Sequence, residues 1–186
     1  MERNNIRSIC VFCGSRYGNI QNYKEASEEI GKLIAKSNLR LVYGGGNVGL
    51  MGSVATAALE YDGDVLGVIT KHLMLKEVGK TELKNLVKTE DMHTRKAILY
   101  RESDAFIIMP GGVGTLDEFF EILTWSQLEL HEKKIVLLNI DNYWEPLIDL
   151  INHQIQHGFM ESSIKKLFCV APSPKKALNL ALNLID

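Results

Sequence analysis

Apolar positions along the chain follow two different periods. Short, continuous apolar runs are typical of strands buried on both faces, and they alternate with longer segments whose apolar residues recur at helical spacing. Strands are predicted at 7–12, 39–43, 65–69, 83–87, 105–109, 135–139 and 168–170. Helices are predicted at 23–37, 50–61, 92–103, 116–130, 144–157 and 174–185, with a less regular segment at 70–79.

This alternation predicts an α/β fold, a Rossmann-like parallel sheet with helices on both faces. The 186 residues contain no repeats or linkers and are expected to form a single domain, 1–186. In such sheets ligands bind beyond the carboxyl ends of the strands, where the strand order reverses. The turns after residues 12, 43 and 109 are therefore expected at the binding edge.

The most informative of these turns is 110–115, Pro-Gly-Gly-Val-Gly-Thr, which links a predicted strand to a predicted helix. Glycines let a backbone approach a phosphate closely, and the free amides of a first helical turn point at it. Thr115 adds a hydroxyl and is a candidate N-cap. Asp117 and Glu118 follow at once. They suit the helix dipole but would repel a phosphate, which indicates that they serve another part of the ligand.

This stretch resembles the signature Pro-Gly-Gly-x-Gly-Thr-x-x-Glu of the LONELY GUY family of cytokinin riboside 5′-monophosphate phosphoribohydrolases, whose members are often misnamed lysine decarboxylases. Three further blocks follow the family's order. They are 12–15 (Phe-Cys-Gly-Ser), 43–52 (Tyr-Gly-Gly-Gly-Asn-Val-Gly-Leu-Met-Gly) and 91–96 (Asp-Met-His-Thr-Arg-Lys). Together the blocks span nearly the whole chain.

The resemblance implies an enzyme that hydrolyses the N-glycosidic bond of an adenosine 5′-monophosphate, plain or N6-modified, to free base and ribose 5-phosphate. It implies a homodimer and no metal or organic cofactor. The family's catalytic pair maps onto Glu118 and Arg95. Its substrate contacts map onto Glu77, Lys96, Gly112, Val113, Gly114, Thr115, Leu116, Asp117 and Thr124.

Three more residues from the matching blocks, Ser15, Gly45 and Gly46, are expected to line the same cleft. Asp117 stands where the family often has Glu, and Val113 stands where it often has Tyr. At position 113 the backbone amide matters more than the side chain. For the dimer, the last helices offer apolar faces such as Leu147, Ile148 and Ile151.

The chemistry explains why acids follow a phosphate site. Cleavage of the glycosidic bond develops positive charge on the ribose, so a carboxylate is needed near C1′ to stabilise that charge or to activate water. A 5′-phosphate held by helix-start amides anchors the rest of the substrate. In this hypothesis Gly112, Gly114 and Thr115 hold the phosphate and Glu118 faces the sugar.

Two of these motifs have a purely structural alternative. Thr115-x-x-Glu118 is also a capping box, in which Glu118 bonds the N-cap amide. Arg95 and Lys96 could be a solvated helix face satisfied by Asp91 and Glu102. However, cations near a helix start oppose its dipole, which indicates an anionic partner, and arginine suits a fork grip on phosphate or carboxylate.

Other functions are weighed against the enzyme. A non-catalytic nucleotide or cofactor carrier is the alternative, because a fold does not fix a function; the presence of both Glu118 and Arg95 favours the enzyme. A decarboxylase would need pyridoxal phosphate on a lysine such as Lys96, and nothing marks an acidic partner for its pyridine nitrogen. Gly44-x-Gly46-x-x-Gly49 matches a dinucleotide fingerprint, but it follows the second predicted strand and lacks the ribose-binding acid, so a nicotinamide cofactor is rejected.

The remaining chemistry-bearing residues are interpreted as structural. Cys10 and Cys13 face opposite sides of a strand, which favours buried thiols over a metal or redox site. His153 and His157 lack an acidic third ligand and are expected to be exposed. His93 and His131 are expected at the polar rim of the site. Phe119 and Trp125 are expected in the core.

Composition excludes several partners. The formal net charge of -2 provides no electrostatic footprint for nucleic acid or an anionic membrane. No apolar run is long enough to span a bilayer. The amino-terminal residues lead directly into a strand without a signal peptide, and the chain has only three cysteines. These features predict a cytoplasmic protein.

Overall fold

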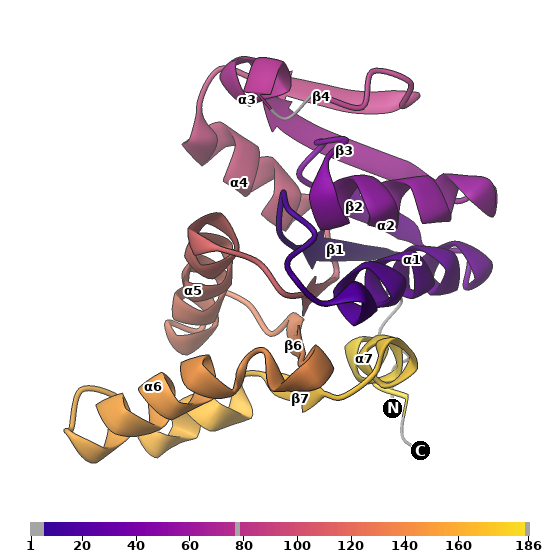
Figure 1. Ribbon diagram of the computed structural model, residues 1–186. Coiled ribbons are helices and arrows are strands. Elements are labelled where there is room, and N and C mark those ends of the chain that lie inside the picture. Colours follow the sequence, from indigo (N-terminus) through magenta and orange to yellow (C-terminus); the bar gives the residue numbers. More distant parts are fainter. Residues whose placement is uncertain (1–5, 77–78, 185–186) are drawn as a thin grey trace.

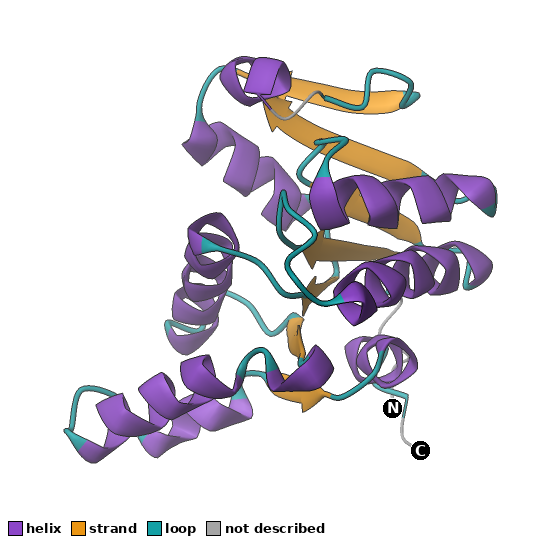
Figure 2. Cartoon of the chain, viewed as in Figure 1, coloured by secondary structure: helices purple, strands orange, loops and turns teal. Residues whose placement is uncertain are grey.

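The computed structural model describes residues 6–76 and 79–184, and it places a seven-stranded sheet between two layers of helices (Figures 1 and 2). The spatial order of the strands is β4-β3-β2-β1-β5-β6-β7, and each neighbouring pair is parallel. The strands are β1 (Ser8–Phe12), β2 (Arg40–Tyr43), β3 (Val65–Thr70), β4 (Asn85–Thr89), β5 (Ala105–Ile108), β6 (Lys134–Leu138) and β7 (Cys169–Ala171). This confirms the predicted fold class.

Helices of different length connect the strands. The α-helices are α1 (Gln21–Lys36), α2 (Gly49–Glu60), α3 (Lys71–Lys76), α4 (Met92–Arg101), α5 (Val113–Gln127), α6 (Glu145–Gln156) and α7 (Pro174–Ala181). Two 3₁₀ helices are η1 (Ile140–Asn142) and η2 (Ser162–Lys166). Helix α3 was not predicted, although Thr70 signals its start: the Thr70 hydroxyl accepts a hydrogen bond from the Leu73 amide at 3.2 Å.

The period of two in each strand divides the core between the two faces of the sheet. On β1, Ile9 and Val11 face a core shared with α1, α2 and α7, whereas Cys10 and Phe12 face a core shared with α4, α5 and α6. Each fully buried large apolar side chain contributes about 1.5–3 kcal/mol to folding. Cys10 and Cys13 therefore lie on opposite faces, both buried and not disulfide-bonded, as predicted.

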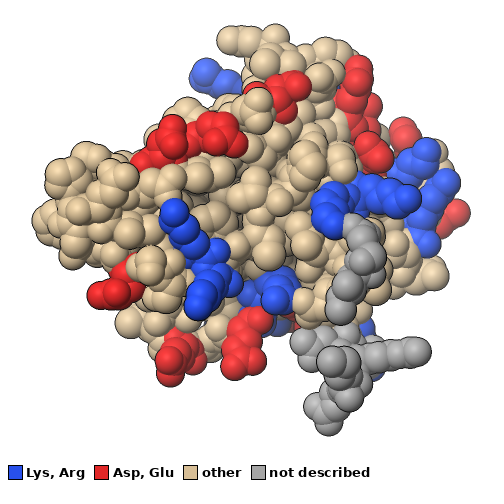
Figure 3. All heavy atoms as spheres, turned by 90° about the horizontal axis from the view of Figure 1, so that it is seen from below, with Lys and Arg blue, Asp and Glu red and all other residues tan. Residues whose placement is uncertain are grey.

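The same core corrects the predicted dimer face. Leu147 and Ile151 are 7% and 1% exposed and pack beneath α6 against the sheet, and Ile148 packs partly against the same core. The prediction failed because a helix that covers an outer strand needs these residues for its own contact. The face seen in Figure 3 carries small groups of basic side chains and small groups of acidic side chains.

The strand order reverses between β1 and β5, because the chain runs outward from β1 to β4 and then returns to the other side of β1. Two hydrogen bonds join the strand ends at this point, from the Met109 amide to the Phe12 carbonyl (2.9 Å) and from the Gly14 amide to the Pro110 carbonyl (3.0 Å). The turn after β1 and the glycine turn after β5 thus lie side by side, where a ligand site is expected.

Candidate active site

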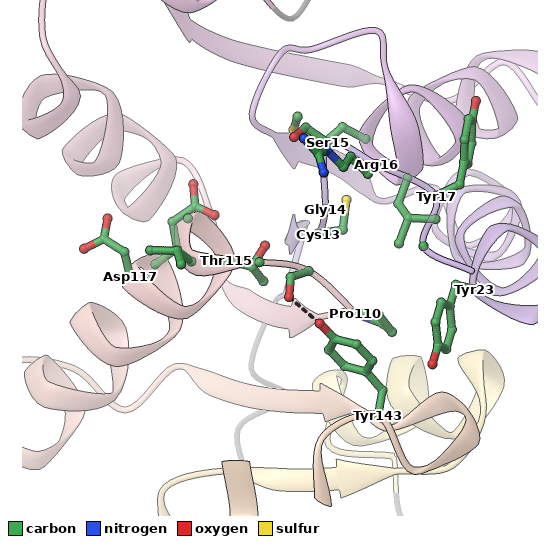
Figure 4. A pocket seen from close by; sticks show the side chains of 18 of the residues that line it. Cys13, Gly14, Ser15, Arg16, Tyr17, Tyr23, Pro110, Thr115, Asp117 and Tyr143 are labelled. Carbon is green, nitrogen blue, oxygen red and sulfur yellow. Dashed lines mark hydrogen bonds between the residues drawn. The ribbon is translucent and has the colours of Figure 1, made fainter. Parts of the chain in front are cut away.

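A cavity of about 610 Å³ opens at this switch point (Figure 4). Its wall is built from the turns after β1 and β5 and the first residues of α2 and α5. Helix α4 adds two side chains, and α1, α3 and the segment after η1 add one each. Figure 4 shows Asp117 at one side of the cavity and Tyr17, Tyr23 and Tyr143 at the other, with Thr115 and Pro110 between them. The volume is sufficient for a small ligand.

The glycine turn leaves backbone donors open toward the cavity. Helix α5 begins at Val113, with Gly112 as its N-cap and no side-chain cap. The amides of a first helical turn have no partner within the helix, so they are available to an anion. A Cβ built on Gly112 or Gly114 would meet no described heavy atom within 4 Å, so both glycines border open space.

Thr115 has a different place from the one predicted. It is the third residue of α5, 4% exposed, and its side chain lies so close to Gly111 that a Cβ there would overlap it. The helix starts earlier than predicted because Gly112 adopts the extended N-cap conformation itself. Thr115 is therefore not the N-cap, although it lines the cavity.

The capping-box interpretation of Glu118 is also wrong. With Val113 as the first helical residue, Glu118 is the sixth, one turn beyond the position from which a side chain reaches the N-cap amide. Its carboxylate pairs instead with Arg95, with Oε1 and Nη1 3.0 Å apart. Both side chains are almost fully buried, at 10% exposure for Glu118 and 6% for Arg95.

Arg95 is held on three sides. Besides Glu118, its Nε donates to the Val68 carbonyl at 3.0 Å and its Nη2 donates to the Gly44 carbonyl at 3.5 Å. The solvated-face interpretation of Arg95 is wrong, because its side chain is buried and pairs with Glu118 rather than with Asp91 or Glu102. The buried carboxylate compensates for the unfavourable position of this cation near the start of a helix. Asp91 instead caps α4 through the Thr94 amide at 2.8 Å, and Glu102 lies 3.7 Å from Arg40.

Lys96, the residue after Arg95 on α4, also contacts α5. Its Nζ lies 3.1 Å from Asp117 and 3.0 Å from Glu121. Lys96 is only 12% exposed, whereas Asp117 is 53% exposed and borders the cavity. One lysine therefore holds the carboxylate that stands next to Glu118 in the sequence.

Burial dominates the electrostatics of Glu118. Desolvation raises the pKa of its carboxyl to about 7, against the opposing effect of the Arg95 charge. An acid with a pKa near neutrality, located in a cavity and paired with a single arginine, has the properties of a general acid or base.

The structure brings together most, but not all, of the predicted site residues. Arg95, Glu118, Ser15, Gly112, Val113, Gly114, Thr115 and Asp117 line the cavity. Lys96, Leu116, Thr124, Gly45 and Gly46 are not among its described wall residues. Glu77 lies outside the described residues.

Local packing explains why several of the predicted residues do not line the cavity. The Leu116 side chain packs into the core beneath α5, and Thr124 is exposed near the far end of that helix. Gly45 lies against Ile69, with φ at +77°, and Gly46 pairs with Gly79 in an isolated bridge. The glycines after β2 thus form a packed loop behind the cavity, in which Gly44 receives Arg95.

Sequence reasoning missed the tyrosines of the cavity wall. Tyr23 and Tyr143 meet edge to face at 5.5 Å, and the Tyr143 hydroxyl donates to the Gly111 carbonyl at 2.6 Å. Tyr143 follows the glycine turn by more than thirty residues, so no local motif connects them. Lys80 was also missed; it is 6% exposed, and its Nζ contacts Asn47 and Thr56, both at 2.9 Å.

Two other assignments change. His131 is not a rim residue, because it is 9% exposed, contacts the rings of Tyr100 and Phe106, and hydrogen-bonds the Ile122 carbonyl at 2.9 Å. Phe119 is fully buried as predicted, whereas Trp125 is only partly buried, edge to face with Tyr100.

Within the described residues, no three His, Cys, Asp or Glu side chains are grouped as a metal ion would require. The described helices include none with the length and apolar character that crossing a membrane requires.

Comparison with known proteins identifies the family. Residues 51–181 match the family model described as "Possible lysine decarboxylase". A probable cytokinin riboside 5′-monophosphate phosphoribohydrolase of Oryza sativa subsp. japonica is 43% identical over 93% of this chain and 71% of its own length. A cytokinin riboside 5′-monophosphate phosphoribohydrolase of Arabidopsis thaliana is 42% identical over 92% and 80%. The chain belongs to the LONELY GUY family.

Solved structures of more distant proteins share the fold. The molybdenum cofactor binding protein of Rippkaea orientalis superposes with a TM-score of 0.72 at 23% identity, covering 98% of this chain and 99% of its own. The Moco carrier protein of Chlamydomonas reinhardtii has a TM-score of 0.72 at 21% identity, covering 97% and 98%. At this level of identity the likeness concerns the fold alone.

Proposed function

We propose that this member of the family hydrolyses the N-glycosidic bond of an adenosine 5′-monophosphate, plain or N6-modified, and releases free base and ribose 5-phosphate. The observation that carries the proposal is the buried Glu118–Arg95 pair at the wall of the cavity that the glycine turn also borders. The names of the relatives that cover most of the chain, cytokinin riboside 5′-monophosphate phosphoribohydrolases, agree with it.

In the proposed mechanism the open amides of the first turn of α5 hold the 5′-phosphate, and Glu118 faces the ribose one turn further along the helix. The bond between C1′ and the base nitrogen breaks, and positive charge develops on the sugar. The ionised Glu118 stabilises that charge or takes a proton from the attacking water, whose oxygen bonds to C1′; the departing base takes up a proton.

Arg95 has a supporting role in this proposal. Its guanidinium, fixed by the Val68 and Gly44 carbonyls, holds the Glu118 carboxylate in one orientation and favours its ionised form. Asp117, held by Lys96, is placed to accept a hydrogen bond from a sugar hydroxyl at the more open part of the wall.

The test is incubation of the purified protein with AMP and an N6-prenylated AMP, with chromatographic detection of the released base. We expect base and ribose 5-phosphate in equal amounts. Adenosine is the matched control and should be a far poorer substrate, because the phosphate anchor would be empty, and part of the loss should appear in kcat. Binding of both nucleotides without release of base would instead support a non-catalytic nucleotide carrier.

We also infer a homodimer in the cytoplasm. Leu128 and Leu130, just beyond the carboxyl end of α5, are 63% and 64% exposed and offer apolar surface for a second copy. The buried thiols of Cys10 and Cys13 agree with a reducing compartment. A monomer mass in solution at micromolar concentration would contradict the dimer.

A further inference from the structure

A tyrosine hydroxyl is one of the groups that hold the glycine turn. Tyr143 Oη lies 2.6 Å from the Gly111 carbonyl oxygen, a short hydrogen bond in which the hydroxyl donates (Figure 4). On the opposite side the Pro110 carbonyl accepts from the Gly14 amide at 3.0 Å, and Gly111 itself lies against Thr115. The turn is therefore fixed by contacts to three separate parts of the chain.

The segment before Tyr143 is unusual in its backbone. Asp141 and Asn142 both have positive φ, at 49° and 58°, and neither is a glycine. Two successive residues in this region cost free energy and persist only where their surroundings hold them, often near a functional site. Here the side-chain amide of Asn22 donates to the Asp141 carboxylate at 3.0 Å. The backbone amide of Trp144 donates to the side-chain oxygen of Asn139 at 2.6 Å.

Further contacts prevent the Tyr143 ring from turning away. It lies edge to face with Tyr23 at 5.5 Å and with Trp144 at 4.8 Å. The Trp144 indole donates to the Ile108 carbonyl at 3.3 Å, on the strand that leads into the glycine turn. The strained segment and the end of β5 therefore share one set of contacts.

The direction of the Gly111 carbonyl sets the direction of the next amide. In a planar trans peptide the C=O of one residue and the N–H of the next point opposite ways. While Tyr143 holds the Gly111 oxygen on its side, the Gly112 amide points away from Tyr143. A free turn containing two adjacent glycines could rotate this peptide at little cost.

We propose that Tyr143 is a positioning residue for the phosphate of the substrate, because its hydrogen bond to Gly111 fixes the 111–112 peptide with the Gly112 amide available to the anion. This inference rests on the proposed function for the identity of the ligand. Tyr143 is not itself a phosphate donor: its one hydroxyl proton is used on Gly111, so toward an anion the oxygen has only lone pairs to offer.

The test compares Tyr143→Phe with the parent protein in two assays. The first measures kcat/KM for AMP and for adenosine. The second measures the dissociation constant of ribose 5-phosphate by calorimetry, which needs no turnover. Phe keeps the ring and its contacts with Tyr23 and Trp144 and removes only the hydroxyl.

We expect kcat/KM for AMP to fall about 5-fold and ribose 5-phosphate to bind correspondingly more weakly, since the loss of one hydrogen bond typically costs about 1 kcal/mol. Adenosine turnover should be unchanged. A merely structural role would reduce both substrates alike and would leave the AMP-to-adenosine ratio where it was. An unchanged ratio together with unchanged ribose 5-phosphate binding would overturn the proposal.

Tyr43→Phe is the matched control. Tyr43 is fully buried on β2, and its hydroxyl has no hydrogen-bond partner among the described residues. Its removal should leave both substrates and the melting temperature unaffected or slightly improved. If the parent protein binds ribose 5-phosphate but cleaves no nucleotide, the proposed function fails while the calorimetric comparison still decides the role of Tyr143. If the parent does not bind ribose 5-phosphate, the positioning proposal fails as well.

Discussion

At one end of the cavity a glycine turn is held by backbone hydrogen bonds and by a tyrosine hydroxyl, whereas at the other end a carboxylate is held by a buried arginine. The first arrangement leaves neutral N–H donors open to an anion and involves no buried charge. The second places two charges out of water, and burial raises the pKa of Glu118 as a result. Binding and chemistry are thus expected to respond to different substitutions, although Glu118 lies only six residues beyond Gly112.

The largest expected effect is at the charged end. Glu118→Gln keeps the shape and the hydrogen-bonding capacity toward Arg95 but removes the charge that a ribosyl cation needs. We expect turnover of AMP to fall at least ~100-fold, the lower range for a lost general base. Nucleotide affinity should be kept or increased, because a carboxylate near the phosphate is gone.

The same variant should keep its stability. Since burial raises the pKa of Glu118, the fold already favours the neutral carboxyl, and a neutral amide should cost little. Unchanged melting with lost turnover would therefore identify a catalytic carboxylate. Hydrolysis of AMP at a near parental rate would show that Glu118 serves only to hold Arg95.

The pH dependence should show the two ends working differently. In the protein free of ligand, kcat/KM requires ionised Glu118, so it should fall about tenfold per pH unit below the pKa of about 7. Binding of ribose 5-phosphate uses the glycine turn and should not require ionised Glu118. A kcat/KM profile that is flat between pH 5 and 8 would contradict a catalytic role for the ionised carboxylate.

Stability should change with pH in the opposite sense. Between the ordinary pKa of 4.5 and about 7, the folded protein binds more protons at Glu118 than the unfolded chain does. The contribution of this residue to folding is therefore most favourable below that window and declines as the pH rises through it. Denaturant titrations at several pH values in this range should give the free energy of unfolding of the parent protein and of Glu118→Gln. The decline of this free energy with rising pH that Glu118 causes should be absent from the variant.

A methyl group at the glycine end provides the complementary change. Gly114 is helical and borders open space, so Gly114→Ala should fold normally and gain up to about 1 kcal/mol of helix stability. Its methyl group would occupy the space where the phosphate approaches. We expect kcat/KM for AMP to fall about tenfold, while adenosine turnover is unchanged, as for an interaction made with the phosphate alone.

Gly111→Ala is the control for Gly114→Ala. A Cβ at Gly111 would overlap the side chain of Thr115 inside the protein, so this variant should lose stability rather than selectivity. The pair would separate a glycine needed for packing from one needed for the ligand. Equal melting temperatures for the two variants would contradict this division.

The difference between the two ends also explains what could be predicted from the sequence. The glycine turn, the strand before it and the helix after it are local, so their order in the chain was sufficient to locate them. The Arg95–Glu118 contact depends on how α4 and α5 pack on the sheet, and the residues alone left a capping box and a solvated face as alternatives. Only the family resemblance selected the pair. Tyr143, Lys80 and the start of α5 depend on long-range contacts or on the backbone of one glycine, and the pattern of side chains carried no signal for them.

The smallest expected effect concerns Lys96, whose role could belong to either end of the cavity. If it acts by holding Asp117, Lys96→Met should lower kcat/KM for AMP and adenosine by the same few-fold factor, because Asp117 would face the sugar in both. If Lys96 approaches the phosphate instead, only kcat/KM for AMP should fall. The loss of stability should remain at or below about 1 kcal/mol, since Asp117 is half-exposed and such pairs are screened by solvent. Asp117→Asn, alone and combined with Lys96→Met, completes a double-mutant cycle. Additive losses in kcat/KM would show that Lys96 does not act through Asp117, whereas a double variant no worse than either single one would place both residues in one positioning unit.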